Sequence, residues 1–135
     1  MANALYDKGR EKFLTGAISW SSDNIKVVLV DAADYTVNLS THEFLSDVAS
    51  GGRVATSGNL ASKTTTAGVA DAADVTFTAV TGDQSEALVI YKDTGSAATS
   101  PLIAYIDTAT GLPVTPNGAD ITVTWDNGSN KIFKL

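Results

Sequence analysis

The sequence of 135 residues contains no cysteine, only one histidine, three prolines and three glutamates. Without cysteine the chain has no disulfide framework, no thiolate metal site and no cysteine nucleophile. No stretch approaches the roughly 20 apolar residues of a membrane helix, and the first residues lack the apolar core of a signal peptide. These absences predict a protein that is soluble as made, folds through its apolar core alone and has no membrane partner.

Positive charge is also scarce, because nine basic residues stand against 15 acidic ones and give a net charge of −6. Binding to a phosphate backbone relies on clustered lysine and arginine. The one basic cluster, Lys8, Arg10 and Lys12, lies beside Asp7 and Glu11, a mixture typical of a solvated helix face. The composition therefore argues against a nucleic-acid partner.

Two kinds of strand-like segment are present. Residues 75–80 and 121–125 alternate apolar residues with threonine, which indicates strands with one wet face. Residues 25–30, 87–91 and 102–106 are nearly continuous apolar runs, which indicate strands covered on both faces. Length and pattern together predict one domain over residues 1–135, mainly β, an antiparallel jelly-roll-like β-sandwich.

An amphipathic helix is predicted over residues 1–16. Asn3 can cap its start, and Gly16 stands where a left-handed C-terminal cap is needed. Tyr6 and Phe13 share one face, and the glycine between them allows close approach to a partner surface.

One short second helix is predicted after Ser40, because Ser40 and Glu43 match a capping box. Gly51 and Gly52 would end this helix.

Two further predictions concern turns and loops. Residues 121–125 and 131–135 flank a five-residue connection with one glycine, which predicts a C-terminal hairpin. Residues 57–74 are rich in serine, threonine, alanine and glycine, which predicts a long exposed loop excursion.

The inventory of reactive side chains predicts no enzyme, no catalytic residue, no cofactor and no bound metal. His42 has no nucleophile motif nearby, and general-base catalysis needs a partner and a pocket. The pairs Asp31 with Asp34 and Asp71 with Asp74, and the loop 126–130, resemble calcium ligands. The EF-hand spacing of glycine and glutamate is absent, however, and aspartates at strand ends are typical turn residues. A small hydrolase remains a rival that needs a concave site with a perturbed acid.

Aromatic residues leave a second rival open. Trp20 and Trp125, with Tyr35, Tyr91 and Tyr105, are numerous enough for a sugar-stacking platform. Trp125 continues the inward register of residues 121–123, which favours a place in the core.

Four segments, MANALYDKGREKFL at the start, NIKVVLVDAADY, ALVIYKDT and the closing GADITVTWDNGSNKIFKL, resemble small virion structural proteins of tailed bacteriophages. The chain is most similar to capsid cement or decoration proteins. That resemblance implies a non-enzymatic β-rich domain on the capsid exterior, made in the host cytoplasm, with the major capsid protein or another virion protein as partner. It also implies self-association as a homodimer or homotrimer over joints of the shell. A tail or fibre location stays open as the alternative, with a carbohydrate-binding module as one form of it.

The contact surface is expected on the helix and the exposed excursion, with Tyr6, Phe13, Leu14, Lys63 and Thr65 as interaction residues. The continuous runs at 87–91 and 102–106 must each have an outward apolar set. We expect the helix to cover one such face and a second protomer or the shell protein to cover the rest.

Overall fold

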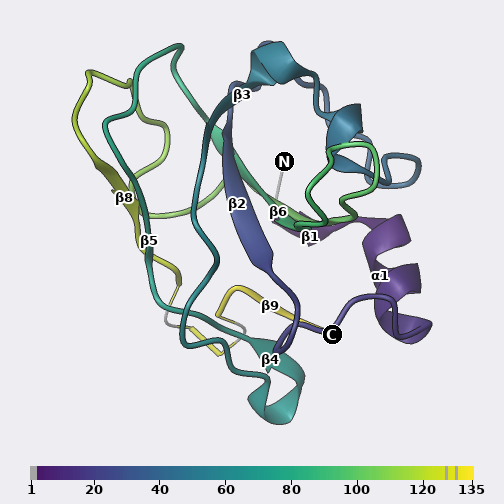
Figure 1. Cartoon of the computed structure of the whole chain (residues 1–135). Helices are drawn as coiled ribbons and strands as arrows, with labels where there is room; N and C mark the ends of the chain where they lie inside the picture. The colour runs from purple at the N-terminus through teal and green to yellow at the C-terminus, as the bar shows by residue number, and fades with distance from the viewer. Residues whose placement is uncertain (1–2, 127, 130) are drawn as a thin grey trace.

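A computed structural model describes residues 3–126, 128–129 and 131–135. Figure 1 shows three layers: a short sheet on the left, the main sheet in the middle, and the α-helix with 3-10 turns on the right. The elements in chain order are β1 (Ala4–Leu5), α1 (Asp7–Leu14), β2 (Ile25–Val30), η1 (Leu45–Asp47), η2 (Ser50–Gly52), β3 (Arg53–Thr56), η3 (Thr66–Gly68), β4 (Val69–Ala70), β5 (Val75–Phe77), β6 (Ala87–Lys92), β7 (Leu102–Ile106), β8 (Ile121–Val123) and β9 (Phe133–Lys134).

The main sheet has five antiparallel strands in the order β1-β7-β6-β2-β3. Its three central strands are the continuous apolar runs of the sequence, as expected for strands buried on both faces. The register of β7 on β6 shifts because Ile103 is an extra residue between the pairs Ile90–Ala104 and Tyr91–Leu102. The bulge directs both Ile103 and Ala104 towards the same core.

The chain itself covers both faces of this sheet. One face carries Val27, Leu29 and Leu88 into a core closed by the two short sheets and both tryptophans. The opposite face carries Val28 and Val30 into a second core closed by tyrosines and by the segment after β2. The expectation that a second protomer or shell protein must cover these runs is therefore wrong, because loops of the same chain bury them.

The C-terminal hairpin is also wrong, because β8 pairs with β5 and β9 pairs with β4. Residues 127 and 130 of its connection lie outside the described residues. Pairing β5 with β8 joins two alternating strands, so that their apolar residues face the main sheet while Thr76 and Thr122 stay exposed. Their hydroxyls hydrogen-bond across the strands at 3.0 Å. The combined apolar face of β5 and β8 favours this pairing over the predicted hairpin between residues 121–125 and 131–135.

The mainly β prediction is confirmed, and so is a helix near the N-terminus. The jelly-roll-like sandwich is not confirmed, because the sheets do not close and the second layer consists of two separate two-stranded sheets.

Helix α1 is shorter than the predicted 1–16. Ala4 and Leu5 pair with β7 instead of starting the helix. Asn3 does not cap the helix, since its Oδ1 accepts the amides of Asp107 and Thr108, both at 3.0 Å. Pairing with the apolar edge of β7 overrides the local helix preference of these residues.

The end of α1 follows the prediction. Gly16 has a φ of 78°, and its N–H donates to the carbonyl of Phe13 at 3.2 Å. The next amide, from Ala17, donates to the carbonyl of Lys12 at 2.8 Å. These two bonds form a Schellman motif, in which a left-handed glycine satisfies the last carbonyls of the helix.

Gly9 allows α1 to lie directly on β7. A Cβ atom at this position would stand 2.6 Å from the carbonyl oxygen of Leu102 and 3.2 Å from Cα of Ile103. Only glycine permits this approach without movement of the helix.

The second helix predicted after Ser40 is replaced by the two 3-10 turns η1 and η2. Asn38, not Ser40, accepts the amides at the start of this region, those of Ser40 and Thr41, each at 3.1 Å. The carbonyl of Glu43 accepts the amide of Leu102 at 2.8 Å. Pairing with β7 therefore holds this segment extended, and the predicted capping box of Ser40 with Glu43 does not form.

Residues 57–74 are largely exposed between 61 and 68 but enter the first core at Leu60, Ala70 and Ala72. No helix among the described residues is both long and apolar enough to span a bilayer.

Candidate functional site

A surface groove runs between helix α1 and strand β9. Its wider part, of about 420 Å³, is lined by Leu5, Arg10, Phe13, Leu14, Lys134 and Leu135. A narrower part of about 310 Å³ continues past β1 and is lined by Asn3, Ala4, Leu5, Arg10, Ala104, Ile106, Asp126, Lys131, Ile132, Phe133 and Lys134. We call the two parts together the α1–β9 groove. Figure 1 shows the end of the chain beside α1, which is how residues from the two ends of the sequence come to share one surface.

Aromatic rings fix the inner wall of the groove. The ring centroid of Phe133 lies 6.1 Å from that of Phe13 and 5.3 Å from that of Trp20, which it meets edge to face. A hollow of about 80 Å³ beside these rings is also lined by Thr65 and Leu135. Edge-to-face contacts of this kind hold aromatic side chains in one arrangement, so the wall is preformed.

Apolar side chains at the rim are unusually open to solvent. Leu14 is 88% exposed and Leu135 is 61% exposed, and among the described residues these are the exposed large hydrophobic side chains. Both line the wider part of the groove.

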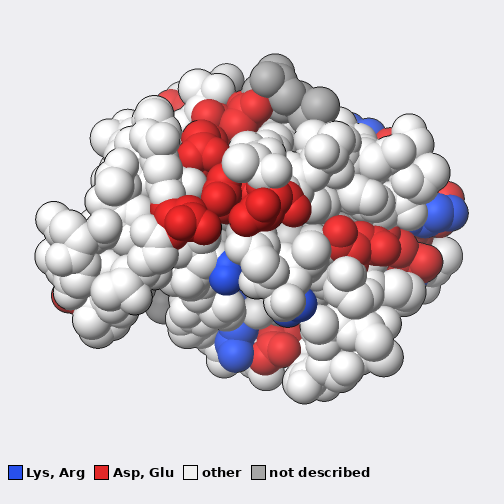
Figure 2. All heavy atoms as spheres, turned by 90° about the horizontal axis from the view of Figure 1, so that it is seen from above, with Lys and Arg blue, Asp and Glu red and all other residues white. Residues whose placement is uncertain are grey.

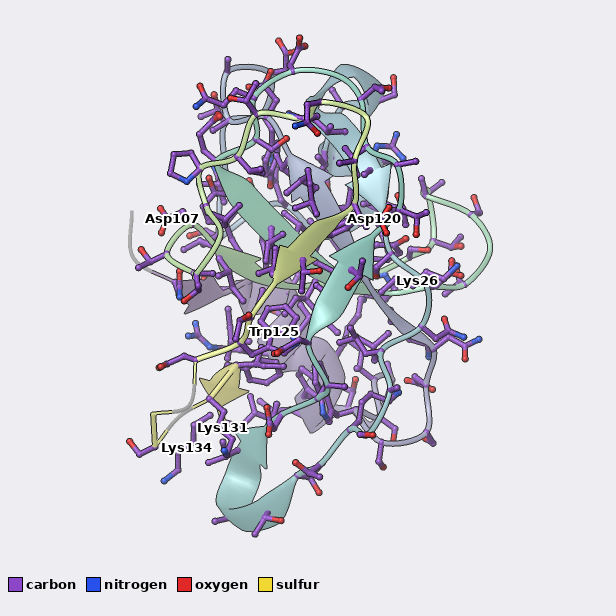
Figure 3. The ribbon with its side chains drawn as sticks, turned by 90° about the vertical axis from the view of Figure 1, so that its left-hand side faces the viewer. Lys26, Asp107, Asp120, Trp125, Lys131 and Lys134 are labelled. Carbon is purple, nitrogen blue, oxygen red and sulfur yellow. The ribbon has the colours of Figure 1, made fainter. Side chains whose placement is uncertain are left out.

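Basic residues border the same surface. Figure 3 shows Lys134, which belongs to β9, and Lys131, which precedes that strand. Arg10 pairs with Asp7 at 3.0 Å, and Lys131 lies 3.8 Å from Asp71. Lys134 makes no ion pair with the residues that the structure describes.

Of the five predicted interaction residues, the structure places two in the groove and a third beside it. Phe13 and Leu14 line its wider part, and Thr65 lines the adjoining hollow. Tyr6 is fully buried in the second core. The ammonium of Lys63 donates to the carbonyl of Asp23, and burial lowers the pKa of Lys63.

The contribution of the C-terminal strand to the groove was not predicted from the sequence. Residues 133–135 were predicted to form one half of a local hairpin, and that prediction did not place them beside α1. The alternation of Phe133 and Leu135 around Lys134 was the available signal, since it places both apolar residues on one side of the strand.

An acidic cluster lies where β2 ends and β6 begins. Single carboxylate oxygens of Asp31, Asp34 and Asp83 lie within 4.8 Å of one another, and Figure 2 shows acidic side chains gathered on the face seen from above. These side chains could hold a cation such as calcium. Asp31 also accepts the amide of Ala33 at 2.8 Å, the turn role predicted for it, and the cluster by itself assigns no ion.

The other aspartates considered as calcium ligands support the backbone or form ion pairs. Asp74 accepts the amide of Trp125 at 3.0 Å, and Asp126 accepts that of Gly128 at 3.2 Å. Asp71 faces Lys131.

His42 ends a chain of hydrogen bonds that leads into the second core. Its Nδ1 lies 2.8 Å from the hydroxyl of Tyr35, which lies 2.9 Å from the hydroxyl of Tyr6. Burial raises the pKa of Tyr35 to about 12 and raises that of Tyr6 further above its ordinary value. Both hydroxyls therefore stay protonated at neutral pH, and the chain serves to satisfy buried polar groups.

Tryptophan and tyrosine form no exposed platform. Both tryptophans and all four tyrosines of the sequence are buried, with 5% exposure or less. The indole N–H of Trp125 donates to the carbonyl of Ala73 at 3.0 Å, and that of Trp20 donates to the carbonyl of Asp71 at 3.2 Å. A stacking surface for sugars requires exposed rings, so the structure does not favour the carbohydrate-binding alternative.

Comparison of the sequence with models of known protein families finds no match, and comparison with curated protein sequences finds none either.

Proposed function

We propose that this chain is a non-enzymatic structural protein of a bacteriophage virion, a capsid decoration protein that binds over joints between major capsid subunits. Two things support the proposal: the resemblance of four sequence segments to such proteins, and the α1–β9 groove. The groove carries the argument, because Leu14 and Leu135, which line it, are the exposed large apolar side chains among the residues that the structure describes. Exposed apolar residues gathered at one place are typical of a protein-binding surface.

Attachment in many copies makes a small groove sufficient. Modest affinity at each contact becomes strong holding when several copies bridge neighbouring subunits. A net charge of −6 helps such a protein stay dissolved at high copy number and disfavours adhesion to DNA.

Self-association as a dimer or trimer belongs to the proposal, but the apolar strand faces no longer argue for it, because the chain covers them itself. We also propose that the main sheet with its two short sheets is an open variant of a jelly-roll-like sandwich.

The experiment is to count copies of the chain in purified virions by quantitative mass spectrometry, relative to the major capsid protein. A decoration protein should be present in proportion to the capsid subunits. A handful of copies per particle would place the chain in the tail or a fibre, and its absence from virions would refute the proposal.

A further inference from the structure

We propose that the α1–β9 groove binds an extended segment of a partner protein that carries apolar side chains and at least one carboxylate. The inference deepens the proposed function and rests on it for the identity of the partner, a segment of the major capsid protein. The chemistry of the bound segment follows from three properties of the groove: exposed leucines, open strand edges and basic side chains.

The leucines call for an apolar partner. Leu14 ends α1 and Leu135 follows β9, so side chains from opposite ends of the chain form one apolar rim around Phe13. Exposed apolar surface is unfavourable in water. Apolar side chains of a bound segment would remove this penalty.

Two strand edges call for an extended partner. In the part of the chain that the structure describes, β1 has a strand partner only in β7, and β9 has one only in β4. Both β1 and β9 line the narrower part of the groove. Unpaired edges present backbone donors and acceptors to a further strand. The volume of about 310 Å³ suits the side chains of a segment rather than a folded domain.

The charges call for an acidic partner. Three basic residues, Arg10, Lys131 and Lys134, line the groove against one acidic residue, Asp126, although the whole chain is acidic. Lys134 has no ion pair among the described residues. The pair of Arg10 with Asp7 is about half exposed on both sides, and Lys131 lies 3.8 Å from a partly exposed Asp71. Exposed pairs of this kind contribute little and can be exchanged for a carboxylate of the partner.

The same charges disfavour a second copy as occupant. A two-fold interface brings the same patch of both subunits together, so it would set Arg10, Lys131 and Lys134 against their own counterparts. Like charges across an interface reduce affinity.

The first test uses the intact chain and two synthetic extended peptides, one of alternating valine and aspartate and one of alternating valine and lysine. We expect the acidic peptide to shift the methyl resonances of Leu14 and Leu135 in NMR spectra and the basic peptide to leave them in place. Equal shifts with both peptides, or none, would overturn the proposal. Shifts caused by dilution of the chain alone would assign the groove to a second copy, and binding to phosphatidylserine vesicles without the peptide effect would assign it to a membrane; either result overturns the proposal.

A second test measures binding of the chain to particles that lack it. We expect Leu14→Asp and Lys134→Glu each to raise the dissociation constant about tenfold or more, which corresponds to about 1.4 kcal/mol. The matched control Lys8→Glu makes the same charge change on α1 outside the groove and should stay within about twofold of the parent.

The two tests separate the groove from the proposed function. Parent-like binding by both groove variants would show that another surface attaches the chain, and would overturn the groove as the attachment site while the decoration role stands. A chain that binds the acidic peptide but no particle would keep the groove and refute the decoration role.

Discussion

Replacing Gly9 by alanine tests how closely α1 packs on the main sheet. The new Cβ would lie 2.6 Å from the carbonyl oxygen of Leu102, whereas ordinary contacts begin at 3.4 Å. The helix must therefore move away from β7, or the strand must yield. The obstructing atoms belong to the backbone of β7, which pairs with β6 on one edge and with β1 on the other, so little relaxation is available.

Two opposing terms set the size of the effect. Exchange of glycine for alanine in an open helix stabilises it by about 1 kcal/mol. Overpacking of a close contact costs about 1–3 kcal/mol, and a clash with backbone belongs at the upper end of that range. We therefore expect Gly9→Ala to lower the free energy of unfolding by about 1–2 kcal/mol.

Urea denaturation followed by circular dichroism measures this difference. Gly58→Ala is the control, because a Cβ atom added to Gly58 would meet no atom within 4 Å other than those of its two chain neighbours. The control should be neutral or stabilise the chain by about 0.4–1 kcal/mol. Equal changes in the free energy of unfolding for Gly9→Ala and Gly58→Ala would contradict the close packing of α1 against β7.

Three further predictions concern buried and capping hydrogen bonds. Tyr35→Phe should lower the free energy of unfolding in urea by about 1–3 kcal/mol, and Tyr6→Phe should lower it by about 1 kcal/mol. Only Tyr35→Phe leaves a buried hydroxyl, that of Tyr6, without a hydrogen-bond partner. Equal losses would contradict the hydrogen-bond chain. Asn38→Ala should lower the free energy of unfolding by about 1 kcal/mol, and Ser40→Ala should lower it by less than about 0.5 kcal/mol. The reverse order would support the capping box of Ser40 with Glu43 instead. Hydrogen bonds from backbone amides lower the pKa of Asp47 in the folded chain. Asp47 therefore stabilises the fold fully above the pKa of an unfolded aspartate, and this stabilisation is lost as the pH falls through the lower pKa of the folded state. Asp47→Asn should flatten that acid-side decline, measured as urea midpoints from pH 7 to pH 3, and an unchanged decline would refute this role.

The sequence was most informative where burial decides the structure. The runs 25–30, 87–91 and 102–106 became the central strands of the main sheet, because a run of apolar residues without alternation suits only a strand covered on both faces. Gly16 ended α1 as predicted, since the left-handed conformation at a helix end depends on one residue.

Local signals failed where distant strands competed for the same backbone. Ala4 and Leu5 have helix preference but pair with β7, and Glu43 offers its carbonyl to Leu102 instead of completing a capping box. Pairings between residues 59 to 101 positions apart leave no local pattern in a single sequence. Pairing of β8 with β5 escaped notice for the same reason.

Only the α1 side of the groove could be predicted from the sequence. Phe13 and Leu14 were expected at a contact surface because an amphipathic helix needs a partner, yet nothing near them in sequence indicates that Leu135 would lie opposite. Conversely, Tyr6 was assigned to the surface from its helical spacing with Phe13. It is buried because the chain is still extended there, which directs Tyr6 into the second core.

Electron cryo-microscopy of the virion, compared with particles that lack the chain, tests the central claim most directly. The account predicts extra density of about the size of this domain over the joints between capsid subunits, with α1 and β9 facing the shell. Density confined to the tail or a fibre, or no difference between the two particles, would contradict it.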